Sequence, residues 1–295
     1  MTSPQTILTA DQYAELRRLH IEVRRLVDKG AVGAYRSAFR GHGIEFEELR
    51  EYSPGDEIRS IDWHVTARAG KPYVKTYREE RELSIVLALD ISGSTTVGTG
   101  SSVREVVIAK TAAALAMIAL SNNDRLGVLT FSDAIEYFHP PSKNSADVWR
   151  ILHTAVDTAQ AKSSKTSLHE VFTFLQQTIR RSSAIFVISD FLAPLPERDI
   201  GALAKRHDVT AVHVQDPSDT TFPSGNLATI RNPETGEVRT IDLRSHLETE
   251  PTNPLHDTFA RQGVDVLSLR TDTPFFPLLR SYFLNRAKQS GARYA

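Results

Sequence analysis

Short apolar segments alternate along the chain with longer segments that are apolar on one face only. The short segments are continuous apolar runs, which is typical of strands buried on both faces. These runs cover residues 84–89, 126–131, 184–189, 209–214 and 264–269. Between them, apolar positions recur every three or four residues and predict helices. The helices are expected at residues 104–120, 146–159, 168–181 and 197–206. The alternation predicts an α/β fold, a mainly parallel sheet with helices on both faces.

Two hairpins and a closing helix add to this core. A Ser-Asp-Ala turn separates residues 126–131 from residues 135–138, which predicts an antiparallel hairpin at the edge of the sheet. Residues 228–230 and 237–241 flank a turn-forming segment and predict a second hairpin on the surface. Residues 274–286 are expected to form a helix that closes the domain.

The first part of the chain follows a different pattern. Residues 11–29 have apolar positions three and four apart, which predicts an amphipathic helix. Residues 40–82 are rich in charge and have no sustained periodicity of either kind. We therefore expect residues 1–82 to pack on a main α/β domain formed by residues 83–295, rather than to fold as a domain of their own.

Composition and charge exclude several functions. The 295 residues include 35 Lys and Arg against 36 Asp and Glu, so a net charge of −1 gives no global attraction to nucleic acid. The absence of cysteine excludes disulfides, thiolate metal ligands and a cysteine nucleophile. The N-terminus lacks the pattern of a secretory signal, and Lys110 interrupts the apolar run at residues 106–120. We therefore expect a cytoplasmic protein without an integral membrane segment.

The loop after the first predicted strand carries the clearest candidate chemistry. In an open parallel sheet, ligands usually bind beyond the carboxyl ends of the strands. There the sequence places Asp90, Ser92 and Ser94, whose side chains can point the same way from an extended segment. One carboxylate and two hydroxyls are hard oxygen ligands, which suit Mg²⁺ or another divalent cation. The alternative is that Asp90 only caps a turn or helix by accepting backbone N–H bonds.

Two later segments bring further oxygen atoms to the same edge. Thr166 precedes a predicted helix, and Asp190 directly follows the third apolar run. In this order, Asp90, Ser92, Ser94, Thr166 and Asp190 resemble the metal-ion-dependent adhesion site of von Willebrand factor A domains. The resemblance implies a von Willebrand factor A-like, Rossmann-like fold with magnesium bound by these five residues.

A longer charged motif narrows the family. Residues 41–63 read GHGIEFEELREYSPGDEIRSIDW, and residues 67–68, 124–127 and 189–191 extend the pattern. These segments resemble the bacterial domain of unknown function 58 family. The resemblance covers residues 30–286 and implies a family-specific segment ahead of the von Willebrand factor A-like domain. It also implies a partner in complex assembly or maturation, either a MoxR-type AAA+ ATPase or a client protein complex.

The charged motif has two interpretations. Its acidic and basic residues either form a structural ion-pair network around Tyr52 and Trp63 or contact a partner directly. Because an isolated buried charge is costly, we favour the structural network. The network is expected to include Arg50, Asp56, Arg59, Asp62 and Trp63.

The sequence supports two functions of different classes. The leading hypothesis is a non-enzymatic protein-interaction module, in which the bound Mg²⁺ accepts a carboxylate from a partner. Neutral hydroxyl ligands leave more positive charge on the metal than carboxylates do, so an external Asp or Glu can complete its shell. The alternative is a magnesium-dependent phosphohydrolase with Asp90 as nucleophile. Against it, haloacid-dehalogenase-like enzymes carry a second Asp two residues after the nucleophile, where this chain has Ser92.

Overall fold

A computed structural model describes most of the chain. The described residues are 29–39, 44–79, 82–96, 103–143, 165–219, 227–231, 238–242 and 254–293. The predicted helix at residues 11–29, apart from its last residue, and the predicted helix at residues 146–159 lie outside the described residues.

Six of the described strands form one sheet. In spatial order they are β10 (Asp265–Arg270), β7 (Asp208–Gln215), β6 (Ala184–Ser189), β3 (Ser84–Asp90), β4 (Arg125–Phe131) and β5 (Ile135–Ser142). All neighbours are parallel except β5, which pairs antiparallel with β4 at the edge. Within the sheet the chain starts at β3, continues outward to β4 and β5, and then crosses over to β6, β7 and β10. This doubly wound order confirms the predicted α/β, von Willebrand factor A-like fold class.

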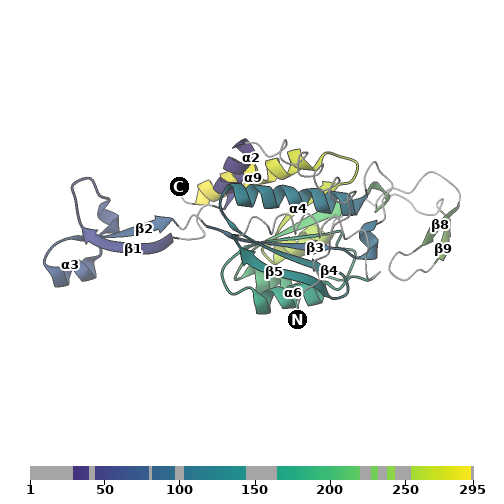
Figure 1. Cartoon of the computed structure of the whole chain (residues 1–295), viewed down its shortest axis with the longest axis horizontal. Coiled ribbons are helices and arrows are strands. Elements are labelled where there is room, and N and C mark those ends of the chain that lie inside the picture. Colours follow the sequence, from purple (N-terminus) through teal and green to yellow (C-terminus); the bar gives the residue numbers. More distant parts are fainter. Residues whose placement is uncertain are drawn as a thin grey trace.

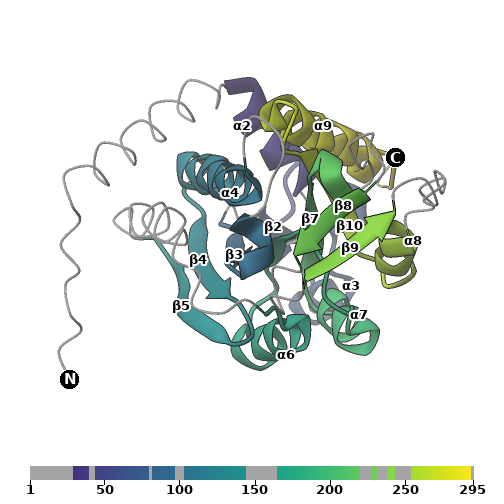
Figure 2. The same cartoon turned by 90° about the vertical axis from the view of Figure 1, so that its right-hand side faces the viewer.

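Helices cover both faces of the sheet, as Figure 2 shows. One face packs against α2 (Lys29–Ala38), α4 (Arg104–Ser121) and α9 (Phe275–Arg293). The other face packs against α6 (Leu168–Thr178), α7 (Glu197–Ala204) and α8 (Pro254–Arg261). Strand β3 contributes Leu87 and Leu89 to the first face and Val86 and Ala88 to the second. Because successive residues point to opposite faces, a strand buried on both faces has no polar position, which explains the continuous apolar runs.

The predicted helices and hairpins within the described residues are confirmed. The helices expected at residues 104–120, 168–181 and 197–206 are α4, α6 and α7, and the closing helix is α9. The edge hairpin is β4 with β5, and the surface hairpin is β8 (Leu227–Arg231) with β9 (Val238–Asp242). Each helix described is too short or too polar to span a bilayer.

Helix α2 ties the first part of the chain to the α/β core. It lies beside α9 in both views (Figures 1 and 2). The buried ring of Phe39, just after α2, lies 6.0 Å from Phe186 and 6.1 Å from Phe283. The Tyr35 hydroxyl donates to a carboxylate oxygen of Asp124 over 3.1 Å, at the loop before β4. These contacts make α2 part of the same core as the sheet, while the division of the chain at residues 82 and 83 stays a prediction.

Between α2 and the sheet, the chain forms a small unit that the sequence did not predict. Strands β1 (Ile44–Glu51) and β2 (Tyr73–Glu79) pair antiparallel, and their connection contains η1 (Ile58–Ser60) and α3 (Trp63–Ala69). In Figure 1 this unit extends away from the α/β core. The register shifts between Phe46 and Glu48, so β1 has no regular alternation of apolar and polar residues to indicate a strand.

Ion pairs hold this unit together. The Arg50 guanidinium donates to both oxygens of Asp56, over 2.6 and 2.8 Å. The Asp62 carboxylate accepts two backbone N–H bonds at the start of α3 and pairs with Lys75 over 2.9 Å. These contacts lower the pKa of both Asp56 and Asp62. The structural interpretation of the charged motif therefore holds for Arg50, Asp56 and Asp62.

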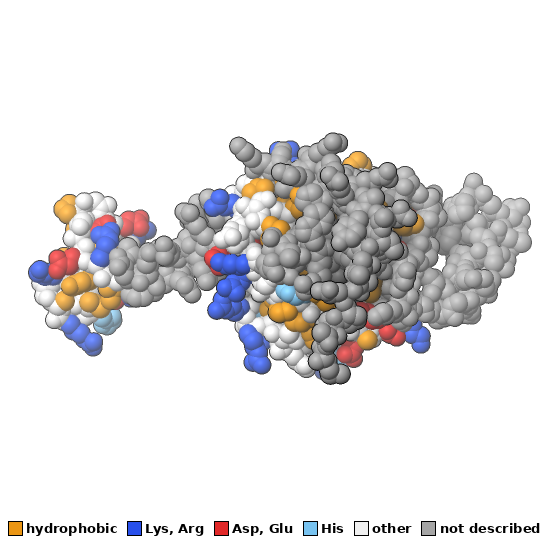
Figure 3. Space-filling model, in the orientation of Figure 1, with side chains coloured by type: hydrophobic (Ala, Val, Ile, Leu, Met, Phe, Trp, Pro, Cys, Tyr) orange, Lys and Arg blue, Asp and Glu red, His pale blue; other side chains and the backbone are white. Residues whose placement is uncertain are grey.

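Trp63 does not fit that interpretation. The sequence predicts ion pairs packed around its ring, but 65% of the residue is exposed, so this prediction is wrong. Of residues 49–75 only Val74 is buried, and a unit with so small a core cannot cover a large ring. Figure 3 shows apolar side chains exposed among charged ones at this end of the molecule.

The docking of α2 can be tested by removing one ring. Phe39→Ala deletes a buried aromatic side chain between α2 and α9, so we expect it to lower the free energy of unfolding by about 3–5 kcal/mol. Leu278→Ala, at a partly exposed position of α9, serves as the control and should cost less than about 1 kcal/mol. Urea unfolding of both variants provides the measurement. If both variants lose the same small amount of unfolding free energy, α2 is not part of the core.

Candidate metal centre

The predicted site lies where the strand order reverses. Strand β3 ends at Asp90, and its parallel neighbour β6 ends at Ser189, directly before Asp190. From β3 the chain leads outward on one side through β4, whereas β6 lies on the other side. Ligand sites of doubly wound sheets form at this crevice. The fold therefore brings the two acidic residues, 100 positions apart in the sequence, to adjacent strand ends.

The Asp90 carboxylate is buried and held by two neighbours. Its Oδ1 accepts the backbone N–H of Ser92 over 2.9 Å, and its Oδ2 accepts the hydroxyl of Ser189 over 2.5 Å. The Ser92 and Ser94 hydroxyl oxygens lie 3.0 Å apart, and both residues are buried. The Thr95 hydroxyl donates to the Ser92 carbonyl oxygen over 2.7 Å and closes the turn. The loop after β3 thus gathers one carboxylate and two hydroxyls, as predicted.

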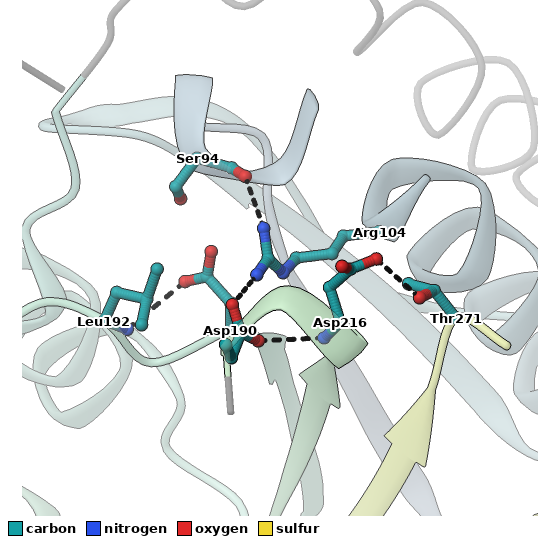
Figure 4. Close-up of polar contacts among 7 residues, drawn as sticks. Ser94, Arg104, Asp190, Leu192, Asp216 and Thr271 are labelled. Atoms are coloured by element: carbon teal, nitrogen blue, oxygen red, sulfur yellow. Dashed lines mark hydrogen bonds and ion pairs between the residues drawn. The ribbon is translucent and has the colours of Figure 1, made fainter. Parts of the chain in front are cut away.

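Asp190 contributes a second buried carboxylate. Its Oδ1 accepts the backbone N–H of Leu192 over 3.2 Å. Its Oδ2 is buried and makes no hydrogen bond within the described part of the chain. Figure 4 shows the Asp190 carboxylate bonded to the Leu192 amide, in the same region as Ser94 and Arg104. A buried carboxylate oxygen without a hydrogen-bond donor is costly, so it marks a place where a positively charged ligand is stabilised.

Burial raises the pKa of both carboxylates, and the charge of Asp190 adds to the shift of Asp90. The pKa of Asp90 rises to about 7, first because it is buried and second because Asp190 is negatively charged. Burial also raises the pKa of Asp190, against the opposing effects of the nearby Ser94 hydroxyl, the Leu192 amide and Arg104. Such a pair favours a bound proton or cation over two free negative charges.

The backbone after Asp190 is unusual. Phe191 has a φ of +51°, which is rare for a residue with a bulky side chain. Its ring is buried against Phe259, and its N–H donates to the Ser189 hydroxyl over 2.9 Å. The next residue, Leu192, is 60% exposed. The strained turn therefore presents an apolar side chain to solvent directly beside the acidic pair.

Thr166 lies in the loop that precedes α6. The N–H of Ser167 donates to the carbonyl oxygen of Ser132 over 2.8 Å, just beyond the end of β4. The neighbouring Phe131 carbonyl oxygen accepts the N–H of Ile91 over 2.8 Å. The loop that carries Thr166 is thus fixed at the strand end next to the β3 loop. The role of Thr166 as a ligand stays a prediction.

Three residues at this edge were not predicted as part of the site. The Ser189 hydroxyl donates a hydrogen bond to Asp90. In the sequence, the only indication of this role is that a hydroxyl residue ends the apolar run at residues 184–189. Arg104, the first residue of α4, donates to the Ser94 carbonyl oxygen over 3.1 Å and pairs with Asp219. Arg104 and Asp219 are 115 positions apart, and no spacing pattern in the sequence indicates that they meet.

The residues brought together fit a hard divalent cation. Two carboxylates and two hydroxyls supply oxygen ligands of the kind that Mg²⁺ takes while keeping several waters. Among the described residues, no three of His, Asp and Glu lie close enough together to hold a metal. A cation at this edge would therefore be held by two carboxylates, which formally balance the charge of a divalent ion, and by neutral hydroxyls.

Fold and site together define an α/β domain with a carboxylate and hydroxyl cluster at the carboxyl edge of its sheet. The chain belongs to the family described as protein of unknown function DUF58, whose model matches residues 48–251. An uncharacterized protein of Mycobacterium bovis is 31% identical over 276 residues, covering 88% of this chain and 84% of that protein. Uncharacterized proteins of Mycobacterium tuberculosis match to the same extent.

Solved structures show more distant likeness. A conserved hypothetical protein, BatB, from Bacteroides thetaiotaomicron is 16% identical with a TM-score of 0.49, covering 71% of this chain and 99% of that one. The von Willebrand factor A domain of SpRpn10 is 10% identical with a TM-score of 0.41, covering 67% and 93%. The fold is therefore assigned from the strand order of the sheet and not from these similarities.

The raised pKa of Asp90 predicts how stability depends on pH without divalent cations. The folded protein keeps a proton on Asp90 that the unfolded chain loses above about pH 4, so this group destabilises the fold as the pH rises toward 7. Asp90→Asn removes this penalty. We expect its stability relative to wild type to increase by roughly 2–4 kcal/mol between pH 4.5 and 7.5, since one pKa unit is worth about 1.4 kcal/mol.

Urea unfolding with a chelator present measures this difference. Asp272→Asn, which removes an exposed carboxylate paired with Arg270, is the control and should show no such increase. If the difference in unfolding free energy between Asp90→Asn and wild type does not change with pH, ionisation of Asp90 does not destabilise the fold.

Proposed function

We propose that this protein is a non-enzymatic interaction module whose metal-ion-dependent adhesion-type site binds Mg²⁺ and, through it, an acidic side chain of a protein partner. The observation that carries the proposal is the buried Asp190 Oδ2, which makes no hydrogen bond in the described structure and lies beside a second buried carboxylate. The hydroxyls of Ser92 and Ser94 complete the cluster.

Each residue has a distinct part in this proposal. Asp90 and Asp190 supply the negative charge, and the Ser92 and Ser94 hydroxyls supply neutral oxygen ligands, with Thr166 as a fifth ligand. Ser189 holds Asp90 through its hydroxyl and so orients the carboxylate. When bound, Mg²⁺ would offer an open coordination position to an external carboxylate, because five protein oxygens leave one position of its octahedral shell.

The rim of the site supports protein binding. Leu192 is exposed beside Asp190, and the buried Phe191 ring fixes the turn that presents it. An acidic side chain bound at the metal would bring neighbouring partner residues close to this leucine. An exposed apolar group next to a charged site is typical of protein interfaces.

The partner we propose is a MoxR-type AAA+ ATPase, a client protein complex, or both, acting in complex assembly or maturation. Membership in the DUF58 family supports this proposal through the resemblance described above. The phosphohydrolase alternative is less well supported, because haloacid-dehalogenase-like enzymes carry a second Asp two residues after the nucleophile, where this chain has Ser92.

Binding to a purified MoxR-type ATPase tests the proposal. We expect binding in Mg²⁺ to be lost with a chelator and in Asp90→Ala, since both remove the cation. Leu192→Ser should weaken binding about tenfold, because it removes an apolar contact worth roughly 1–2 kcal/mol. Leu278→Ser, at an exposed position of α9, is the matched control and should bind normally.

Biolayer interferometry on the full chain gives these affinities, and a phosphate-ester assay on the same samples tests the alternative. Binding that persists in both Asp90→Ala and the chelated protein would reject the metal bridge. Magnesium-dependent ester hydrolysis that disappears in Asp90→Ala would favour the phosphohydrolase.

A further inference from the structure

Arg104 is a buried cation in an unfavourable place. It is the first residue of α4 and only 3% exposed. A positive charge at a helix N-terminus opposes the helix dipole, and burial of a guanidinium costs free energy unless it is paired. Its contacts offset these costs: one amino group donates to the Ser94 carbonyl oxygen over 3.1 Å (Figure 4), and the other pairs with Asp219.

Asp219 connects this contact to two other strands. It lies in η3 (Pro217–Asp219), just beyond β7, and its Oδ2 accepts the N–H of Asp216 over 2.8 Å. Asp216 in turn accepts the hydroxyl of Thr271, just beyond β10, over 2.7 Å. The loop that carries Ser94 is therefore tied through Arg104 to the carboxyl ends of β7 and β10.

The pair changes the charge of the acidic site little. Arg104 lowers the pKa of Asp190, whereas Asp219 raises it, so the two charges act in opposite directions. What remains is the geometric effect: Arg104 holds the backbone of the loop at Ser94, whose hydroxyl lies 3.0 Å from that of Ser92.

We propose that Arg104 and Asp219 form a positioning clasp that fixes the Ser92–Ser94 loop in a geometry selective for Mg²⁺ over Ca²⁺. The inference rests on the proposed function, since it concerns the same cation. Mg²⁺ requires near-ideal octahedral ligands at about 2.0–2.1 Å, whereas Ca²⁺ accepts irregular geometry at about 2.3–2.6 Å. A loop released from the clasp therefore loses Mg²⁺ affinity more than Ca²⁺ affinity.

The test compares the two ions in a variant that keeps the net charge. Arg104→Met combined with Asp219→Asn removes one positive and one negative charge together. Isothermal titration of the full chain with MgCl₂ alone and with CaCl₂ alone gives the two dissociation constants. We expect the constant for Mg²⁺ to rise about tenfold or more, as is common when supporting residues of a metal site are removed, and that for Ca²⁺ to rise less than about threefold.

The control removes an exposed Arg–Asp pair that is not part of the clasp. Arg270 and Asp272 pair over 2.8 Å near the end of β10, and Arg270→Met with Asp272→Asn should leave both constants unchanged. If the buried double variant does not fold, Asp219→Asn alone, which keeps Arg104, should shift the ratio of the constants in the same direction by a smaller factor.

The outcomes separate the two proposals. Wild-type protein that binds neither ion would overturn the proposed function and the clasp with it. Alternatively, the wild-type protein binds Mg²⁺ while the two dissociation constants of the variants change by equal factors or not at all. That result would overturn the clasp and leave the proposed function standing. If the ion pair only stabilises the fold, its removal should lower the melting temperature without changing the ratio of the Mg²⁺ and Ca²⁺ dissociation constants.

Discussion

The candidate site depends on two carboxylates that are buried at adjacent strand ends. Parallel pairing of β3 with β6 places Asp90 and Asp190 at the same edge, so the topology alone brings them together. Burial removes their solvation, and the charge of Asp190 makes ionisation of Asp90 still less favourable. The pair is neutralised by a proton or by a cation, and the hydroxyls around it are ligands that a hard cation takes.

The rest of the fold keeps these groups in place. Strand β3 is packed on both faces, and α4, which follows the site loop, is buried along most of its length. Because packed interiors deform little, the strand ends form a rigid frame for the loops they carry. Ser189 fixes Asp90 on one side of this frame, and the Arg104–Asp219 clasp fixes the Ser94 loop on the other. The β1–β2 unit, with its exposed Trp63, lies apart from this frame.

The sequence predicted the sheet and the acidic residues for a clear reason. Strands buried on both faces leave continuous apolar runs, and Asp90 and Asp190 directly follow two of them. It did not predict β1, where the register shift after Phe46 disturbs the alternation. It also did not predict the pairing of Arg104 with Asp219, because ion pairs between distant loops leave no periodic pattern. The expected packing around Trp63 failed because its unit has almost no core.

Anomalous X-ray diffraction from crystals soaked in Mn²⁺, an ion similar to Mg²⁺ in its preference for oxygen ligands, tests the central claim most directly. We expect one strong peak among Asp90, Ser92, Ser94 and Asp190 in the wild-type protein, and no peak there in Asp90→Ala. A saturating soak that leaves this edge of the sheet without a peak, or a peak that remains in Asp90→Ala, would contradict the central claim.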